Sequence, residues 1–518
     1  MKTAKTSKRA LLCSVLSIAL CLSMLIGTTF AWFTDTATTA VNKIVSGKLE
    51  VDLIDAGTEE SLQGEGKSLQ FKSADGKIGE AILWEPGATY KTQGFKIKNN
   101  GNLALKYKVA INGTTGSSDL LKVITFSIVN ANTKEVVDLN AFEGQLKTAN
   151  ALSDTYYIQG HMAETAGNEY QEKELDGVTI TVYATQDTYE KDSKDDQYDV
   201  NAAYPELVST AAELQTALNE GKSAILQDDV ALTEVLTVAE GKTAAIDLNG
   251  NTLTDNTTNG LEVNGTLVIE DTSANGKIAL AGKNGSINVA GGATLVVNSG
   301  TITMTDTNNS NGMIYCYDGG TAVINGGTLE AKYAPISGNN TTGNMNFIVN
   351  GGTITAKRGP AIYMPGQCEL TITGGTLNGG ISLRMGQVNI SGGVINSISE
   401  NIDEPSEYYD YSGNAWMPDA LYVFGGTYTS KDATYGNSLN LNITGGTFNC
   451  LNDKGSAVAV YDLGKVEQAM KVNISGATLS TNATSRQAAQ VLSLADIGVT
   501  SPKTGFGVYS GKVHFNVK

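Results

Sequence analysis

The 518-residue chain is acidic, with 36 Lys and Arg against 53 Asp and Glu and a formal net charge of −17. Such a charge repels phosphate backbones and anionic lipid headgroups, which argues against nucleic-acid partners and electrostatic docking to membranes. The 58 glycines and 17% charged residues are typical of a protein rich in strands and turns, and the length allows two or three domains.

Residues 1–31 have the form of an export signal. Four basic residues precede the apolar run 11–26, which is too short to span a bilayer comfortably, and residues 29–31 (TFA) resemble a cleavage site. The alternative is an uncleaved membrane anchor, but Gly-Thr-Thr interrupts the apolar run and no basic flank follows it. We therefore predict a secreted protein with no stable membrane span after cleavage.

The segment 32–46 mixes bulky apolar residues with small polar ones and would leave apolar groups in water as an isolated arm. It must therefore pair with something, either as the first strand of its own domain or as a strand donated to a neighbouring subunit. A head-to-tail donation does not close on itself and generates filaments. The candidate residues of this strand-donor arm are Trp32, Phe33, Val41, Ile44 and Val45.

Residues 32–190 predict a β-sandwich or jelly-roll. Apolar residues alternate along 48–54 and 178–182, and they do so again on both sides of the Asn99-Asn100-Gly101 turn, where Asn-Gly chemistry predicts a tight hairpin. Residues 150–175 carry no clear period, and no state is predicted for them.

Three stretches of this region resemble the TasA/camelysin family of secreted bacterial matrix proteins. They are Trp32–Leu53, Glu85–Ile111 and Gly177–Tyr198, and the resemblance covers about residues 1–200. It implies export, a place in a biofilm matrix or at the cell surface, and assembly into fibres.

Camelysin-like relatives are classed as metallopeptidases, so a metal site at His161 and Glu164 has to be weighed. A zinc peptidase usually needs two histidines one helical turn apart with a glutamate base. The chain's only other histidine is His514. A structural histidine is therefore the preferred interpretation, no metal or other cofactor is predicted, and the metallopeptidase stays an alternative.

Residues 191–223 predict an acidic linker followed by a short capping helix. The acidic run 187–199 lacks the alternating Asp/Asn and central Gly of a calcium loop, which favours a solvated linker. Residues 206–220 place leucines 207, 214 and 218 near helical spacing and end at Gly221, so this helix is placed to cap the open end of the next domain.

From residue 224 to 518 the chain repeats. Each copy has apolar residues four and two positions before a pair of small residues and another three after its first member, as in Leu370, Ile372, Gly374-Gly375 and Leu377. Strands separated by glycine corners at this interval predict a parallel β-solenoid of about a dozen coils. The small-residue pairs of the eight copies lie at 299–300, 326–327, 351–352, 374–375, 392–393, 425–426, 445–446 and 476–477.

This half resembles the right-handed parallel β-helix of the pectin-lyase-like superfamily, many members of which cleave acidic polysaccharides. The Gly-His-Gly of one enzyme class in that superfamily is absent here. Arg358 and Arg384 are about one coil apart, but no Asp cluster accompanies them at matching spacing, so surface arginines are the preferred interpretation. No catalytic residue is predicted.

Aromatic residues crowd one stretch of the repeats, where they form either a ligand-binding patch or a packed loop. They are Tyr408, Tyr409, Tyr411, Trp416, Tyr422 and Tyr428. Of the five cysteines, Cys316, Cys368 and Cys450 lie outside the signal, and their number and spacing favour buried free thiols over a zinc site, with one disulfide left open.

Taken together, the sequence predicts an all-β, secreted structural protein of a bacterial surface or biofilm matrix that is more consistent with a non-enzyme. Its first domain would self-associate by strand exchange, and its β-helix would serve as rod or adhesive module. The alternatives are a β-helix protein that binds or cleaves an extracellular glycan, and a camelysin-like metallopeptidase.

Overall fold

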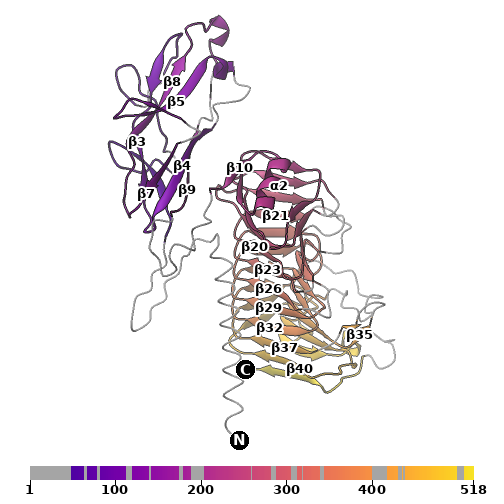
Figure 1. Ribbon diagram of the computed structural model, residues 1–518. Coiled ribbons are helices and arrows are strands. Elements are labelled where there is room, and N and C mark those ends of the chain that lie inside the picture. The colour runs from indigo at the N-terminus through magenta and orange to yellow at the C-terminus, as the bar shows by residue number, and fades with distance from the viewer. Residues whose placement is uncertain are drawn as a thin grey trace. The chain divides into compact units, whose positions relative to one another are not determined.

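The computed structural model describes residues 48–63, 67–78, 82–112, 119–138, 142–173, 175, 179–187, 204–257, 260–281, 287–304, 312–317, 319–338, 344–398, 417–429, 434–435, 438–498 and 507–518. It divides into two compact units, residues 1–204 and 205–518 (Figure 1). The boundary falls inside the predicted linker, and each unit is described by itself.

The first unit holds two antiparallel sheets. Leu53, Phe95 and Ile97 of the first sheet share one buried core with Leu105 and Tyr107 of the second. The sandwich or jelly-roll topology of this unit stays a prediction. The six-stranded sheet comprises β1 (Val51–Asp55), β2 (Thr89–Lys91), β3 (Phe95–Asn99), β5 (Ile124–Asn130), β6 (Val136–Val137) and β8 (Tyr156–Met162). The three-stranded sheet comprises β4 (Leu105–Asn112), β7 (Glu143–Leu146) and β9 (Thr179–Gln186), and two 3-10 turns, η1 (Asp119–Lys122) and η3 (Asn168–Tyr170), complete the unit.

The predicted hairpin at Asn99-Asn100-Gly101 is wrong, because β3 and β4 belong to different sheets. The Asn99 side chain accepts a hydrogen bond from the Gly101 N–H and donates to the carbonyls of Leu103 and Leu146. It therefore redirects the chain from one sheet to the other. Strand β8 was not predicted either. It lies in residues 150–175, for which no state was predicted, and it pairs with β5.

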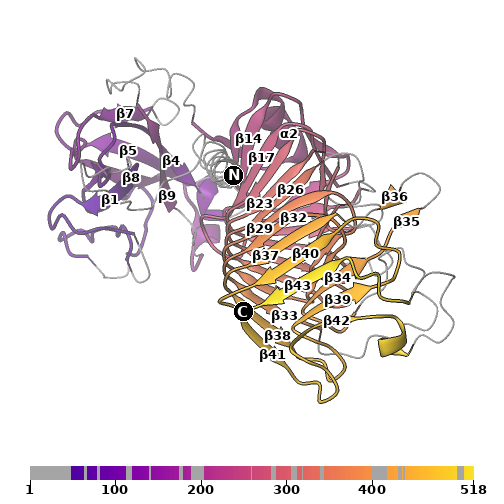
Figure 2. The same ribbon diagram turned by 90° about the horizontal axis from the view of Figure 1, so that it is seen from below.

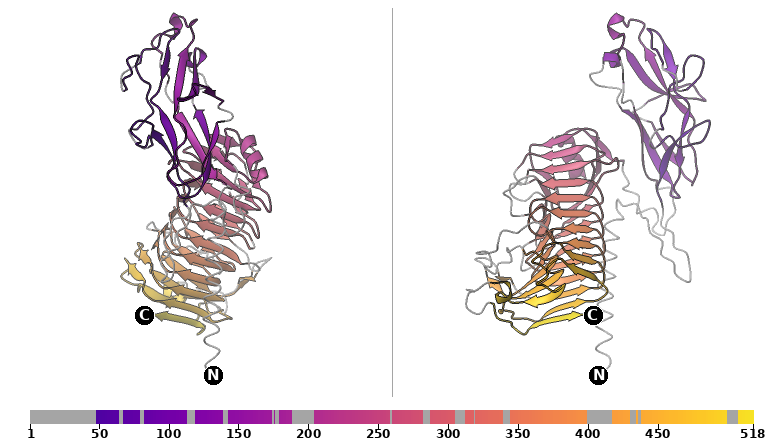
Figure 3. Two further views of the ribbon diagram at one scale, coloured as in Figure 1. Left: turned by 60° about the vertical axis from the view of Figure 1, so that its left-hand side comes forward. Right: turned by 180° about the vertical axis from the view of Figure 1, so that it is seen from behind.

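The second unit is a parallel β-solenoid, as predicted, with three strands in a full coil (Figures 2 and 3). Successive strands of each sheet pair in parallel, so that equivalent residues of neighbouring coils stack. The first solenoid sheet has twelve strands: β10 (Glu206–Val208), β11 (Ser223–Leu226), β14 (Thr243–Asp247), β17 (Thr266–Glu270), β20 (Thr294–Val297), β23 (Thr321–Ile324), β26 (Met345–Val349), β29 (Cys368–Ile372), β32 (Gly386–Ile390), β37 (Leu439–Ile443), β40 (Met470–Ile474) and β43 (Val513–Val517).

The other two solenoid sheets have ten strands each. The second comprises β12 (Val230–Leu232), β15 (Thr252–Asp255), β18 (Lys277–Leu280), β21 (Thr301–Met304), β24 (Thr328–Ala331), β27 (Thr353–Ala356), β30 (Thr376–Asn378), β33 (Val394–Asn396), β38 (Thr447–Cys450) and β41 (Thr478–Thr481). The third comprises β13 (Leu236–Val238), β16 (Leu261–Val263), β19 (Ile287–Val289), β22 (Ile314–Cys316), β25 (Ile336–Gly338), β28 (Ile362–Met364), β31 (Ile381–Leu383), β34 (Leu421–Gly425), β39 (Val458–Asp462) and β42 (Ala489–Leu492). A hairpin of β35 (Tyr428–Thr429) and β36 (Thr434–Tyr435) and the 3-10 turn η4 (Ala495–Ile497) lie outside these sheets.

The repeat pattern works as predicted in the first two solenoid sheets. Leu370 and Ile372 point inward from the first sheet, Leu377 points inward from the second, and all three are fully buried. The glycine pair between them makes the corner: Gly375 has φ +86°, and a side chain there would meet the Gly351 carbonyl of the previous coil at 2.8 Å. One buried cluster of aliphatic residues runs through the coils from Val208 to Ile474.

One of the eight copies is not a repeat of this corner. Leu421 and Val423 belong to β34 in the third solenoid sheet, where they pair with Ile381 and Leu383. An alternating strand followed by Gly425-Gly426 imitates the motif, although here the strand occupies another side of the coil. The prediction for this copy was therefore wrong in register.

Asparagine side chains stack along the outside of the corner between the first two sheets. Asn325 Nδ2 donates to Asn298 Oδ1 at 2.9 Å, Asn350 donates to Asn325 at the same distance, and the Thr373 hydroxyl donates to Asn350 at 2.8 Å. A second such ladder joins Asn378, Asn396 and Asn449. These bonds fix the register of the coils against one another.

The predicted capping helix is α2 (Ala211–Glu220), which begins five residues later than predicted. Residues 206–208 form β10 instead and pair with β11, so the solenoid starts there rather than at residue 224. Thr210 and Glu213 make a reciprocal capping box, and Gly221 ends the helix with φ 76°. Leu214 and Leu218 are fully buried in the solenoid core, so α2 closes this end of the coils.

Cys316, Cys368 and Cys450 are buried free thiols, as predicted. Burial raises the pKa of Cys316 and raises that of Cys368 to about 12, which keeps both thiols protonated and unreactive.

Candidate functional site

The outward face of the third solenoid sheet carries a continuous row of polar and aromatic side chains. The second residue of each strand from β16 to β42 points away from the core, and parallel pairing puts these residues in line along the solenoid. From β16 to β42 the row runs Glu262, Asn288, Tyr315, Ser337, Tyr363, Ser382, Tyr422, Ala459 and Gln490.

Tyrosines alternate with small residues in the centre of this row. Tyr315 and Tyr363 are half-buried, while Ser337 and Ser382, which follow them, are 2% exposed. Two rungs of a sheet separate the two tyrosines, so their rings repeat about every 9.6 Å along the face. The row therefore presents aromatic surfaces separated by polar notches.

Polar groups accompany the aromatic rings at the β16–β22 end of the row. Tyr315 and Tyr317 meet edge to face with ring centroids 4.9 Å apart, and Tyr317 is 48% exposed. Asn288 Nδ2 donates to Glu262 Oε1 at 2.8 Å. Burial, together with the negative charge of Glu262, raises the pKa of Tyr317 above its usual value. This combination of ring faces, an amide and a carboxylate suits a polyhydroxylated ligand.

At the other end of the row the aromatic residues are covered. Tyr422 is 1% exposed and packs edge to face on Phe424 at 5.5 Å, and Phe424 stacks on Tyr461 at 5.8 Å. Together with Met417, Leu463, Leu492 and Leu494 they form a second core on the outside of the sheet. Of the two alternatives, an accessible binding patch or packed residues, Tyr422 therefore follows the second, because the residues of this second core cover it.

A buried carboxylate belongs to this second core. Asp419 is 1% exposed, accepts a hydrogen bond from the Tyr461 hydroxyl at 2.5 Å and accepts another from the Ser456 N–H at 2.7 Å. Burial raises the pKa of Asp419 to about 6, although these hydrogen bonds and Arg486 act in the opposite direction. Because it is enclosed, Asp419 has no access to a substrate and its role is structural.

Arg384 is also buried, at 1% exposure, so its predicted surface position was wrong. Its guanidinium lies 5.8 Å from the Phe424 ring centroid and donates from Nη1 to the Gly426 carbonyl. This burial was not predicted, because Gly425-Gly426 was assigned to a repeat corner. Arg358, one coil earlier, is exposed as predicted.

The side chains of the other predicted aromatic residues are not among those that the structure describes. Tyr408, Tyr409, Tyr411 and Trp416 lie outside the described residues, and Tyr428 is placed only by its backbone in the β35–β36 hairpin. The strand-donor arm, Trp32, Phe33, Val41, Ile44 and Val45, also lies outside the described residues.

His161 lies on β8, where its Nδ1 is 2.8 Å from the Thr89 hydroxyl oxygen. Glu164 follows in a turn. Within the described ranges, no group of three or more His, Cys, Asp or Glu side chains is arranged to hold a metal ion.

Sequence reasoning missed Tyr315 and Tyr363 as a pair. The available signal was their position: each sits in the centre of a three-residue strand (IYC and IYM) that follows the second-sheet strand of its coil. Aligning coils on the third strand as well as on the glycine corners would have placed both residues in one row.

No protein-family model, no curated protein and no solved structure matches the chain. In the part of the chain that the structure covers, no helix is both long and apolar enough to cross a membrane.

Proposed function

We propose that this is a secreted structural protein of a bacterial surface or biofilm matrix. Its first domain, a β-sandwich, assembles by exchange of the arm 32–46, and its right-handed β-helix projects as a rigid rod. The observation that carries the rod is the twelve-stranded parallel sheet, which runs from β10 to β43 over a single buried core. In such a solenoid each coil packs on its neighbours, so the stacked coils form a continuous rod.

Incomplete burial on one side of the first unit supports strand exchange. On β4 the inward residues Leu105 and Val109 are fully buried, whereas Ile180 and Val182 of β9, the strand beside it, are only partly buried. Leu49 and Val51, at the start of the first sheet, are partly buried as well. An apolar strand from a neighbouring subunit would cover these side chains and add main-chain hydrogen bonds.

Electron microscopy of residues 32–518 and 47–518 tests the assembly. We expect filaments from the longer protein and none from the shorter one. A variant carrying Ile44→Asp and Val45→Asp should behave like the deletion, while Thr38→Ala and Thr39→Ala in the same arm should leave filaments intact. Filaments that persist without residues 32–46 contradict the strand-donor mechanism.

A second candidate function, the binding of a neutral extracellular glycan, rests on the tyrosine row. The faces of sugar rings pack on aromatic rings, and their hydroxyls hydrogen-bond to amides and carboxylates. The spacing of Tyr315 and Tyr363 is close to the length of a disaccharide in an extended chain. An acidic polysaccharide is disfavoured by Glu262 in the row and by the net charge of −17.

Calorimetry with neutral and acidic oligosaccharides tests this candidate. Tyr315→Ala and Tyr363→Ala should each weaken binding of a neutral oligosaccharide about threefold to tenfold. Tyr509→Ala, an exposed tyrosine outside the row, is the matched control and should bind as the parent protein does. Binding that both row variants leave unchanged contradicts a glycan site on this face.

A further inference from the structure

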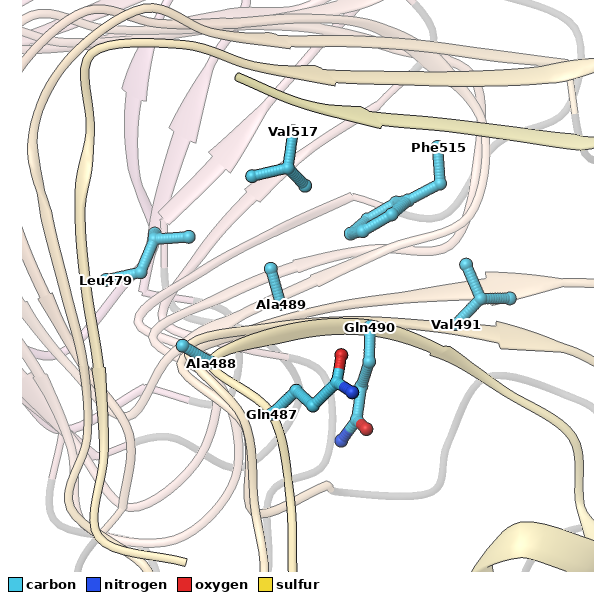
Figure 4. A pocket seen from close by; sticks show the side chains of 8 residues that line it. All are labelled: Leu479, Gln487, Ala488, Ala489, Gln490, Val491, Phe515 and Val517. Atoms are coloured by element: carbon cyan, nitrogen blue, oxygen red, sulfur yellow. The ribbon is translucent and has the colours of Figure 1, made fainter.

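The end of the solenoid formed by β41, β42 and β43 exposes residues that are core residues elsewhere. Val517 is 51% exposed, whereas its partner one coil earlier, Ile474, is 3% exposed. Leu479, Ala489 and Val491 are likewise only partly buried. Together with Gln487 and Gln490 these residues line an open depression of about 630 Å³, and Figure 4 shows Phe515 and Val517 of β43 across from Leu479, Ala489 and Val491.

The two ends of the solenoid differ in how they are finished. At the β10 end, α2 packs against strands of all three sheets, and Gln215 satisfies the backbone of Thr237 in β13. At the other end, β41, β42 and β43 are the last strands of their sheets, and among the described residues no further strand pairs with them. Solenoids usually need a polar capping element at each end, because stacked strands otherwise leave apolar surface and unpaired main-chain groups in water.

The two ends also carry opposite charge. Residues 205–242, the first coil with its helix, contain seven acidic and two basic side chains, a formal charge of −5. The described residues of 465–518 contain two acidic and five basic side chains, a formal charge of +3, in a protein that is strongly acidic overall. Exposed acids of the first coil include Asp228, Glu234 and Glu240, while Lys512 and Lys518 flank β43.

We propose that the open end of the solenoid is an interface that binds the α2-capped end of a second copy of this chain, head to tail. The first solenoid sheet has one strand more than the other two sheets at each end of the solenoid, β10 at one end and β43 at the other. Stacking would therefore place β10 of one copy beside β43 of the next. This pairing is parallel, as is every other rung of the sheet. Leu207, on β10 and 37% exposed, offers an apolar contact at the acidic end.

Charge selects this orientation. A tail-to-tail contact would bring two basic ends together, whereas a head-to-tail contact places a −5 end against a +3 end. The contact is heterologous, so it adds copies along the solenoid axis without closing. The interface is separate from the arm of the first unit and goes beyond the function proposed above.

Sedimentation of residues 32–518 at low and high salt tests the proposal. We expect reversible, concentration-dependent association at low salt that weakens as ionic strength rises, because the opposed charges are screened. Lys512→Glu with Lys518→Glu, and separately Glu234→Lys with Glu240→Lys, should each weaken association about tenfold. The matched control, Lys277→Glu with Arg358→Glu, changes the same number of charges along the middle of the solenoid and should associate as the parent does.

Mixing the two charge-reversed variants supplies the decisive result. The lysine variant keeps an unchanged β10 end and the glutamate variant keeps an unchanged open end, so the mixture should form pairs with the affinity of the parent, whereas each variant alone associates about tenfold more weakly. Val517→Asp should weaken association at every salt concentration; it should form pairs when mixed with the glutamate variant, whose open end is unchanged, and not when mixed with the lysine variant, whose open end is altered as well. Deleting residues 32–46 should leave the salt-sensitive association in place, which separates this interface from strand exchange.

Two results would overturn the proposal. One is a protein that stays monomeric at low salt after the arm is deleted. In that case Lys512 and Lys518 would serve to prevent pairing at the exposed edge of β43 and would not bind a second copy. The other is equal loss of association in the mid-solenoid control, which would indicate a general effect of charge.

Discussion

The side chain of Gln215 binds the backbone of Thr237 as a neighbouring strand would. Its Nε2 donates to the Thr237 carbonyl oxygen and its Oε1 accepts from the Thr237 N–H, both at 2.9 Å. Helix α2 therefore does more than cover the apolar end of the solenoid, because it also satisfies the exposed edge of β13.

Gln215→Ala should open this edge. The variant loses the two hydrogen bonds to Thr237 and an exposed one to the Asn219 side chain, and it leaves two main-chain groups of Thr237 unsatisfied, which costs about 1–2 kcal/mol. Hydrogen exchange of peptides covering residues 230–265 should become about tenfold faster. Thr216→Ala on the same helix, where the hydroxyl bonds only to the Ala212 carbonyl, is the control. Equal protection in both variants would show that α2 acts by apolar cover alone.

Substitutions at two glycines with the same backbone conformation should distinguish the cost of backbone strain from the cost of a clash between stacked coils. Gly292 and Gly352 have φ +79° and +78°, but a Cβ at Gly292 meets nothing within 4 Å, whereas at Gly352 it lies 2.8 Å from the carbonyl oxygens of Gly326 and Gly327. Gly292→Ala should cost about 1 kcal/mol of unfolding free energy from backbone strain. Gly352→Ala should cost about 3 kcal/mol or more, because neighbouring coils must separate.

Urea unfolding of both glycine variants, with unchanged far-ultraviolet circular dichroism in the folded state, provides the measurement. Similar losses at the two positions would mean that coil spacing adapts freely and that stacking does not require glycine at the corner.

Substituting an asparagine in the interior of the ladder should destabilise the solenoid more than substituting one at its end. Asn325 bonds to Asn298 on one side and to Asn350 on the other, so Asn325→Ala breaks two bonds and should destabilise the solenoid by about 1–2 kcal/mol. Asn298→Ala breaks the single bond to Asn325 and should cost about half as much. The comparison uses urea unfolding, and a larger loss at Asn298 would contradict a ladder that acts rung by rung.

Asp419 predicts a distinct pH dependence. Its pKa is about 6 when folded and 3.8 in the unfolded reference, so the folded protein favours the neutral acid. The stabilisation of the folded state by neutral Asp419 is complete below about pH 4, is lost as the pH rises through about 6, and is absent at higher pH. A pKa difference of about 2 corresponds to about 3 kcal/mol.

The variant Asp419→Asn should remove that dependence, because an amide stays neutral at every pH. The difference in unfolding free energy between variant and parent should therefore change by about 3 kcal/mol between pH 4 and pH 7. Asp228→Asn, at an exposed position, is the control. A difference that stays constant with pH would mean that Asp419 is not the titrating group.

The sequence predicted the parts of the solenoid that glycine marks. Gly374-Gly375 and its equivalents identify the corner between the first two sheets, because a positive φ beside a stacked carbonyl admits no other residue without strain. The third sheet has no such marker. From β13 to β31 its strands, such as Ile362–Met364, are three residues long, too short for an alternating pattern to stand out.

The failures come from interactions that sequence spacing does not encode. Asn99 closes its turn with side-chain bonds to Leu103 and Leu146, and the second partner is 47 residues away. Arg384 is buried because a carbonyl at Gly426 and the ring of Phe424 receive it, again from a distant coil. Such partners become visible only when the chain is folded.

The ladders also hold across coils of very different length. Asn396 bonds to Asn378 over 18 residues, whereas Asn449 bonds to Asn396 over 53 residues, at 2.9 and 3.0 Å. An excursion of dozens of residues therefore leaves the pitch of the stack unchanged. During evolution, or in engineering, loops of new sequence can be grown from a single coil to diversify the surface, while the register above and below that coil is preserved.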